Sequence, residues 1–275
     1  MKVLLLTSDY HISANIGVRT FLENPSLMKN GIEVVGIILV DQLNFDRKPI
    51  ERTMKFLRRV GFVFFVTSVF TNIWKQIGMS FGRRFLRSKE REYLSMREMA
   101  ETRGIPLLQT DSVNSERSVS FIRERKPDLL VSCFLLEMVK KEVLDIAPKG
   151  GVNVHPALFQ HHRGVFSSFW AMMKGWRKSG ATVHYMTQKL DEGKVILQKR
   201  FFVHPSDTMH CINRKSATLG GNLLAKAVVR IKRNRVRGYR TKRVGQMFTV
   251  PGIEDVRSFY RRGKSLIKAK DFFGL

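Results

Sequence analysis

The first forty residues constrain the fold more than any other part of the chain, because they read as strand, helix, strand. Lys2 to Thr7 is a short apolar run, and Ile32 to Val40 is a second run rich in β-branched residues. Between them, Ser13 or Asn15 is placed to cap a helix that continues to about Glu23. Two strands joined by a helix are expected to lie parallel in one sheet. The sequence therefore predicts an α/β fold with a mostly parallel sheet flanked by helices.

Later segments continue the same alternation. Asp128 to Cys133 reads as a central strand, Glu137 to Ile146 as a helix, and Val152 to Val154 as the next strand. No Gly-x-Gly-x-x-Gly sequence follows the first strand, so a dinucleotide-binding site has no support.

The charge of the chain implies an anionic partner. Its formal net charge is +26 over 275 residues, which suits nucleic acid, an anionic membrane surface or a phosphorylated substrate. Cys133 and Cys211 are isolated, so neither a disulfide framework nor a metal site of the zinc-ribbon kind is expected. The first apolar run is too short for a signal peptide. These observations favour a cytoplasmic location.

One stretch, residues 150–198, carries polar residues in a pattern that suits catalysis. Asn153 and His155 are two apart, so on a strand they project from the same face. Residues 190–193, Leu-Asp-Glu-Gly, read as a turn that feeds a new strand. An amide, an imidazole and the carboxylate of Asp191 can thereby converge on one cleft. Each residue alone is as often a simple loop cap, but the ordered set is more specific.

With these residues set out, the segment resembles the catalytic half of the folate-dependent formyltransferases. That group includes the glycinamide ribonucleotide, methionyl-tRNA and sugar N-formyltransferases. Residues 153–156 match the family's Asn-x-His-Pro element, and residues 180–203 fit its signature around Asp-x-Gly. Residues 157–164 match its Ser-Leu-Leu-Pro-x-x-Arg-Gly loop, with Ala157, Phe159 and Gln160 as departures. The resemblance is good over roughly residues 127–231.

The resemblance implies a Rossmann-like formyltransferase domain over residues 1–234. A basic insertion at residues 47–91 and a short basic extension at residues 235–275 are additions to it. By the family's pattern, Asn153, His155 and Asp191 are the catalytic trio, and 10-formyltetrahydrofolate is the co-substrate. The residues expected to bind the folate are Phe134, Leu135, Leu136, Leu190 and Gly193.

Three further residues are expected to contact the acceptor. His11 lies in the loop after the first strand, at the sheet edge where α/β proteins bind ligands. Arg163 belongs to the Arg-Gly loop, and His184 resembles a position near the substrate in some family members.

The chemistry explains why these residue types are needed. An amine attacks the formyl carbon, an oxyanion forms and the amine loses a proton. An amide donor such as Asn153 is worth roughly 3–4 kcal/mol to such an oxyanion. His155 can add a second donor, and Asp191 can favour the charged imidazole or act as general base. No covalent enzyme intermediate is required.

The insertion at residues 47–91 holds twelve Lys or Arg residues and only two acids. Within it, residues 66–81 predict a helix with one apolar face, on which Phe70 and Trp74 lie. Lys75 and Gln76 make the segment too polar to span a membrane. A helix lying in the surface of an anionic membrane is expected, on its inner face. A contact with the domain itself or with a second subunit of a homo-oligomer is the alternative.

The acceptor is harder to assign than the donor. The part after the long helix is shorter than the second domain of methionyl-tRNA enzymes, so tRNA ranks below other acceptors. Residues 230–243, which hold eight basic residues and no acid, could nevertheless bind tRNA. The Gly-rich phosphate loop of the glycinamide ribonucleotide enzymes is missing. An amino sugar linked to a nucleotide or lipid carrier is therefore expected. The alternatives are a methionyl-tRNA or glycinamide ribonucleotide formyltransferase, a 10-formyltetrahydrofolate hydrolase, and a non-catalytic basic membrane- or RNA-binding protein on the same fold.

Overall fold

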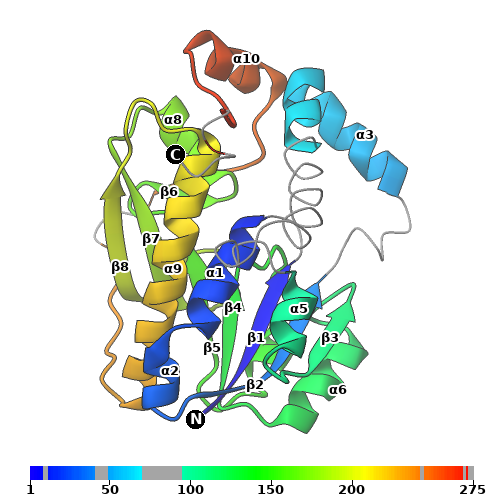
Figure 1. Ribbon diagram of the computed structural model, residues 1–275, viewed down its shortest axis with the longest axis vertical. Coiled ribbons are helices and arrows are strands. Elements are labelled where there is room, and N and C mark those ends of the chain that lie inside the picture. The colour runs from blue at the N-terminus through cyan, green and yellow to red at the C-terminus, as the bar shows by residue number, and fades with distance from the viewer. Residues whose placement is uncertain (9–11, 41–48, 70–94, 242–244, 269–270, 272–275) are drawn as a thin grey trace.

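A seven-stranded sheet with helices on both faces forms the body of the protein (Figure 1). The structure is a computed structural model that describes residues 1–8, 12–40, 49–69, 95–241, 245–268 and 271. The strands are β1 (Lys2–Ser8), β2 (Glu33–Val40), β3 (Leu107–Thr110), β4 (Leu129–Cys133), β5 (Gly151–His155), β6 (His162–Gly164), β7 (Lys178–Tyr185), β8 (Val195–Phe202) and β9 (Gln246–Phe248). The helices are α1 (Ile12–Leu22), α2 (Pro25–Lys29), α3 (Pro49–Val60), α5 (Met96–Glu101), α6 (Glu116–Arg125), α7 (Lys141–Leu144), α8 (Ser167–Met173), α9 (Met209–Lys232) and α10 (Ile253–Arg261).

The strand order is β3-β2-β1-β4-β5-β7-β8. The strands from β1 to β5 are mutually parallel, and β7 is antiparallel to both β5 and β8. The predicted α/β fold with a mostly parallel, Rossmann-like sheet is confirmed. Its order reverses beside β1, which places the ends of β1 and β4 at a switch point of the kind where open α/β sheets bind ligands.

Two apolar clusters cover the two faces of the sheet, because alternate side chains of each buried strand point to opposite sides. Val3 and Leu5 pack with residues of α1, α5 and α9 on one face. Leu4 and Leu6 pack with residues of α6 and α7 on the other. Both faces of the parallel strands are thus removed from water.

The predicted helix over residues 137–146 is wrong for most of its length, since only α7 is helical there. The cause is tertiary hydrogen bonding. The carboxylate of Glu137 accepts from the Ser112 hydroxyl at 2.5 Å and from the Val113 amide at 2.7 Å. The Lys140 amide donates to the side chain of Asn114 at 2.8 Å. These contacts hold the stretch before α7 against the loop that follows β3.

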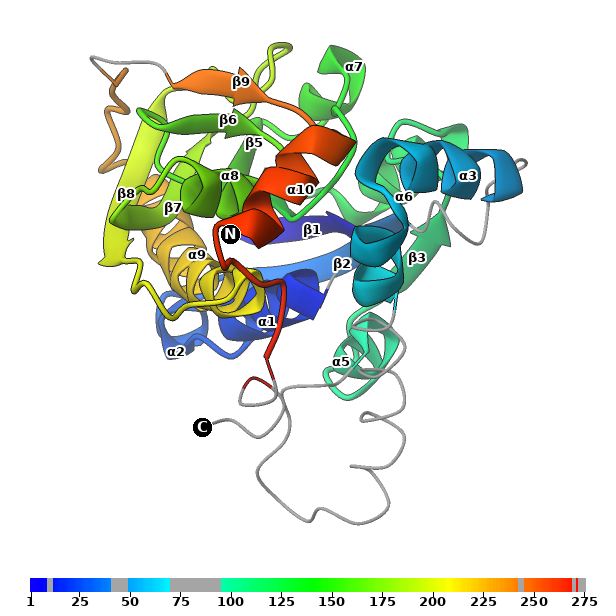
Figure 2. The ribbon, with the colours of Figure 1, turned by 90° about the horizontal axis from the view of Figure 1, so that it is seen from above.

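A third cluster lies beyond the carboxyl edge of the parallel strands, where α3, α8 and α10 gather (Figures 1 and 2). Residues 49–69, here called the basic arm, comprise α3 and a further helical segment at residues 62–69. Val60 and Phe64 anchor the arm in this cluster. Arg59 fixes it to the chain after β9, donating to the Val250 carbonyl at 2.8 Å and to the Thr249 hydroxyl at 3.0 Å.

The part of the insertion that would contain Phe70 and Trp74 lies outside the described residues, as does His11. Within the described parts of the chain, no helix is both long enough and apolar enough to cross a membrane.

Candidate active site

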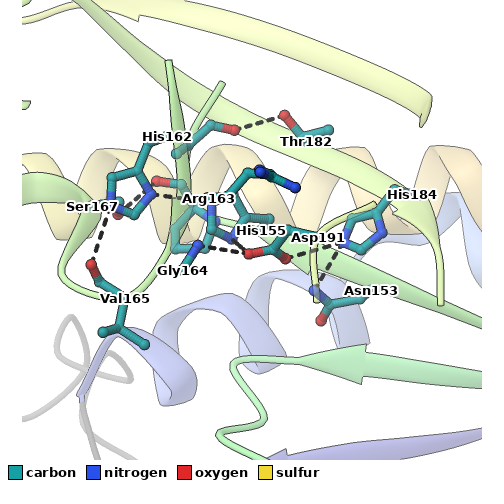
Figure 3. A network of polar contacts seen from close by, with 12 residues as sticks. Asn153, His155, His162, Arg163, Gly164, Val165, Ser167, Thr182, His184 and Asp191 are labelled. Atoms are coloured by element: carbon teal, nitrogen blue, oxygen red, sulfur yellow. Dashed lines mark hydrogen bonds and ion pairs between the residues drawn. The ribbon is translucent and has the colours of Figure 1, made fainter. Parts of the chain in front are cut away.

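The polar site lies where the antiparallel strands β5 and β7 run side by side at the carboxyl end of β5. In their register Asn153 is opposite His184, and His155 is opposite Thr182. The turn between β7 and β8 brings Asp191 between His155 and His184 (Figure 3). The structure therefore brings the three predicted catalytic residues together, with His184 as a fourth member of the group.

The amide of Asn153 is held in one orientation. The Ser132 hydroxyl on β4 donates to its Oδ1 at 2.8 Å, and its Nδ2 lies 3.1 Å from Nε2 of His184. The Tyr185 carbonyl leaves Nε2 of His184 as an acceptor, so the atom of Asn153 that faces it is the amide nitrogen. These contacts use one of the two amide N–H groups, and the second has no partner within the described part of the chain.

His184 is a neutral imidazole. Its Nδ1 lies 2.9 Å from the carbonyl of Tyr185, so Nδ1 carries the proton and Nε2 accepts from Asn153. The side chain is buried, and this burial lowers the pKa of His184 to about 4. The neighbouring Asp191 carboxylate acts in the opposite direction but does not offset the burial.

Asp191 is buried and takes a left-handed backbone conformation with φ of 53°. Such a conformation costs a residue other than glycine roughly 1–2 kcal/mol. Its Oδ2 accepts from the Gly164 amide at 2.8 Å and lies 3.5 Å from Nδ1 of His155. Its Oδ1 lies 3.7 Å from Nε2 of His184. The turn thus places one carboxylate between two imidazoles and a backbone donor.

Gly193 explains why the turn has the sequence Asp-x-Gly. A Cβ atom at this position would lie 1.6 Å from the Tyr185 carbonyl oxygen and 3.1 Å from Nδ1 of His184. Only a residue without a side chain lets the turn pack so closely on β7. The same Tyr185 carbonyl fixes the tautomer of His184, so one carbonyl group both receives the close approach of Gly193 and orients the imidazole.

His155 is enclosed by ring systems. It is 4% exposed, with Phe159 and His162 each at a ring-centroid distance of 5.6 Å. Its Nε2 lies 3.5 Å from Nδ1 of His162, on the side away from Asp191. Both nitrogens of His155 therefore face other polar groups of the site.

The residues expected to bind the folate lie on two loops beside this group. Phe134 has φ of 57°, and its ring packs so closely on α1 that a Cβ on Gly17 would be 2.8 Å from it. The amide of Leu136 donates to the Ser8 hydroxyl at 3.1 Å, which ties the first loop to the end of β1. Leu136 is 52% exposed and Leu190, on the other loop, 46% exposed. Exposed apolar side chains on both loops fit a flat aromatic ligand such as a pterin, while Leu135 packs into the core.

The Arg163 side chain is held by two contacts and links segments of the site. Its Nε donates to the Gly245 carbonyl at 3.0 Å, and its Nη1 pairs with Glu192 at 2.9 Å. The predicted substrate residue thus connects the Asp191 turn to the chain before β9.

Sequence reasoning missed Ser132, His162 and Phe248. Ser132 is the polar residue of an otherwise apolar strand, a signal that points to a role. His162 occupies a variable position of the Arg-Gly loop, and Phe248 lies far along the chain, so no local pattern marks them. No group of three or more His, Cys, Asp or Glu residues among those described has the geometry of a metal site.

Comparisons with known proteins bear on the family and the fold. The family model described as "Formyl transferase" matches residues 76–228. A methionyl-tRNA formyltransferase of Anaeromyxobacter sp. (strain K) is 34% identical over 129 residues, covering 47% of this chain and 41% of that protein. The chain thus spans about two fifths of the length of the curated relatives it matches.

Solved structures share the fold at low identity. A glycinamide ribonucleotide transformylase 1 from Symbiobacterium toebii has a TM-score of 0.59 at 17% identity, covering 87% of this chain and 94% of that one. An N-formyltransferase from Helicobacter canadensis, in complex with folinic acid and dTDP-3-aminofucose, has a TM-score of 0.52 at 15% identity, covering 90% and 71%.

Proposed function

The chain belongs to the formyl transferase family, and from that premise we propose that it transfers a formyl group from 10-formyltetrahydrofolate to an amine. The convergence of Asn153, His155 and Asp191 in one group carries the proposal, because acyl transfer to an amine needs an oxyanion donor and a proton acceptor. The folate donor supplies a formyl group already activated on nitrogen, so the protein needs no nucleophile of its own.

Asn153 is the principal oxyanion donor. Its amide is locked by Ser132 and His184, so the remaining N–H has a fixed direction before any substrate arrives. A fixed donor stabilises the oxyanion of the transition state more than one that must reorient. Its loss raises the activation free energy by roughly 3–4 kcal/mol. His155 lies on the same face of β5 and, when protonated, places positive charge beside the oxyanion.

Asp191 is the proton acceptor. Its carboxylate has neutral His184 on one side and His155 on the other, and it already accepts one hydrogen bond from Gly164. A carboxylate oxygen has capacity for more than one donor, so an ammonium or amine proton can be taken directly or through water. Neutral His184 cannot compete for this role, because its free lone pair is already used by Asn153.

The acceptor is an amino sugar carried on a nucleotide or a lipid. The bound dTDP-3-aminofucose of the Helicobacter canadensis enzyme supports a nucleotide-linked amine, and the net charge of +26 supports a phosphorylated substrate. The curated relatives favour methionyl-tRNA as a second candidate. Release of formate to water is a third.

One experiment separates these candidates. Purified protein is incubated with 10-formyltetrahydrofolate and, in separate reactions, a nucleotide-linked amino sugar, methionyl-tRNA or no amine. Formylation of the sugar supports the proposal, and formylation of the tRNA alone replaces the sugar as acceptor. Formate release at the same rate without any amine contradicts formyl transfer and assigns a hydrolase.

The basic arm supports a second proposal, that the protein works at the inner face of an anionic membrane. Phe62, Val63, Val66 and Val69 are 71%, 63%, 42% and 38% exposed, and their spacing places them on one side of the segment at residues 62–69. Lys55, Arg58 and Arg59 on the adjoining α3 are exposed and basic. An apolar row beside exposed positive charges is the chemistry that an anionic lipid surface accepts.

A further inference from the structure

A buried histidine lies directly behind His155 and has no part in the chemistry described so far. His162 on β6 is fully buried, and its ring is inclined by only 19° to that of His155. Its Nδ1 is 3.5 Å from Nε2 of His155. A fully buried polar ring needs partners, and one of its two hydrogen-bond partners among the described residues is the proposed catalytic imidazole.

The hydrogen bonds of His162 fix the direction of its proton. Its Nε2 lies 3.1 Å from the carbonyl of Val165, a group that can only accept, so Nε2 carries the hydrogen. The neutral ring then presents a bare lone pair on Nδ1 toward His155. Burial, aided by the nearby His155, lowers the pKa of His162 to about 3, so the ring stays neutral at physiological pH.

This direction determines how His155 is protonated. Its Nε2 must donate to His162, while its Nδ1 faces the carboxylate of Asp191 at 3.5 Å. The lone pair of His162 therefore requires the hydrogen on Nε2 of His155. In the part of the chain that the structure describes, His162 and Asp191 are the titratable groups that face His155, since His184 lies across Asp191 and 3.7 Å from its other oxygen.

The C-terminal strand holds His162 in place. Phe248 of β9 stacks on His162 with ring centroids 5.0 Å apart and planes inclined by 7°. The β6–β9 pairing is so close that a Cβ on Gly164 would lie 2.2 Å from the Phe248 carbonyl oxygen. The Trp170 indole donates to the Thr249 carbonyl at 2.9 Å, which secures the far end of the strand. Residues of the C-terminal part therefore form one wall of the candidate active site.

We propose that His162 is the positioning residue of His155, and that Phe248 completes the site by holding His162 in the orientation that accepts from it. The inference rests on the role proposed above for His155 in formyl transfer. It assigns a function to β9, which pairs with β6 and so joins the loop at residues 157–164 to the C-terminal extension.

The first test replaces His162 by Phe, which keeps an aromatic ring for the stack but cannot accept a hydrogen bond. We expect kcat/KM to fall about 10- to 100-fold, the scale of a hydrogen bond to a charged group. The pH profile of kcat/KM should change as well, because His155 loses the acceptor opposite its Nε2. His162→Asn, whose side-chain oxygen can accept near the position of Nδ1, should recover part of the loss.

His161→Phe is the matched control. This neighbouring histidine packs on Trp176 at a centroid distance of 5.2 Å, not on His155, so its replacement should leave the pH profile unchanged. Phe248→Leu should lower kcat/KM about 3- to 10-fold, since the bond from His162 to Val165 still holds the ring in part. An unchanged rate and pH profile in His162→Phe would overturn the proposal.

A second measurement does not depend on activity. Nitrogen-15 NMR of histidine-labelled protein, assigned with the two variants, reports which ring nitrogens carry hydrogen. We expect a bare Nδ1 on His162 and hydrogen on Nε2 of His155. A protonated Nδ1 on His162 would overturn the proposal even in an active enzyme. The expected pattern in a protein that fails to formylate any amine would instead contradict the proposed function and leave this arrangement standing.

Discussion

The Asp191 turn and the basic arm differ in how completely their side chains are partnered. Asp191 is 6% exposed, and its two carboxylate oxygens lie within 3.7 Å of two imidazoles and a backbone amide. On the arm, Phe62 is 71% exposed although Phe64, two residues later, is buried against Phe166 and Phe169. The comparison indicates that the turn is built to hold atoms in place, whereas the arm keeps an apolar face available for a partner.

The largest effect should come from replacing the three proposed catalytic side chains. Asp191→Asn and Asn153→Ala should each lower the rate of formyl transfer by about 100-fold or more, through loss of the base and of the oxyanion donor. His155→Ala should act on a similar scale. Single-turnover kinetics with a formyl acceptor measure this loss. Near-wild-type turnover in two of the three variants would contradict the catalytic assignment.

Glu192→Gln is the matched control for that experiment. Glu192 follows Asp191 directly, but its side chain is 43% exposed and pairs with Arg163 at 2.9 Å. Exposed pairs of this kind contribute less than about 1 kcal/mol. We therefore expect turnover within about 3-fold of wild type, which would show that the carboxylate position, and not the charge of the turn, decides activity.

The next largest effect concerns stability. Gly193→Ala places a methyl group where the Tyr185 carbonyl oxygen would be 1.6 Å away, so the turn must move off β7. We expect a loss of about 3 kcal/mol or more, which lowers Tm by about 6 °C or more in a protein of this size. Gly104→Ala is the control, because Gly104 has φ of 60° but open space around it. Calorimetry should show a clearly smaller change there, and equal changes would mean that the close approach is not what the glycine provides.

The sequence predicts the residues around the Asp191 turn better than it predicts the stacked rings of His162 and Phe248. Asn153, His155 and Asp191 are readable because each belongs to a local pattern, a strand end or an Asp-x-Gly turn. The parallel sheet is readable for the same reason, since buried strands such as β1 and β4 are continuous apolar runs. The helix expected at residues 137–146 failed because Glu137 binds residues 112–114, which lie on a distant loop.

The pairing of β6 with β9 could not be predicted because both strands are only three residues long and lie some eighty positions apart. Neither has enough length for its own periodicity to show. The role of Phe248 follows only from that pairing. Local patterns thus predict the catalytic atoms, while the groups that orient them depend on contacts between segments distant in sequence.

Two of the buried histidines, His184 and His162, predict that acid destabilises the turn region. Burial lowers the pKa of His184 to about 4 and that of His162 to about 3, below the ordinary value of 6.5 that the unfolded chain shows. Between those values the unfolded chain binds more protons, so the free energy of unfolding falls as pH falls below 6.5. At pH 5 the loss is about 2 kcal/mol for each group.

Urea unfolding at pH 7 and pH 5 measures this loss. His162→Phe removes one of the two histidines and should reduce the difference in the free energy of unfolding between the two pH values by about half. His204→Gln serves as control, because His204 is exposed and lies outside the site. A pH dependence that is the same in His162→Phe as in wild type would mean that His162 is charged, or solvated, in the folded protein.

Substitutions on the basic arm should have the smallest effect on the chemistry. They are expected to change membrane binding and not the rate of formyl transfer. Replacing Phe62 and Val66 by Ser removes apolar surface from the exposed row but leaves the buried anchor at Phe64 and the contact of Arg59 with Val250. Each side chain that inserts into lipid contributes roughly 1.5–3 kcal/mol. Flotation with anionic liposomes should therefore weaken by about 10-fold or more, while kcat toward a water-soluble amine stays at the wild-type value.

Met28→Ser provides the control for that loss, since Met28 is 81% exposed but lies on α2, at the end of the molecule away from the arm (Figure 1). Salt should weaken the binding of the wild-type protein without abolishing it, because exposed charges are screened beyond about 10 Å at 0.1 M salt while inserted apolar groups are not. If the wild-type protein floats with neither anionic nor neutral vesicles, the arm does not bind lipid. The exposed row is then the surface for a second protein subunit, and sedimentation of the same Phe62 and Val66 variant would show whether an oligomer is lost with it.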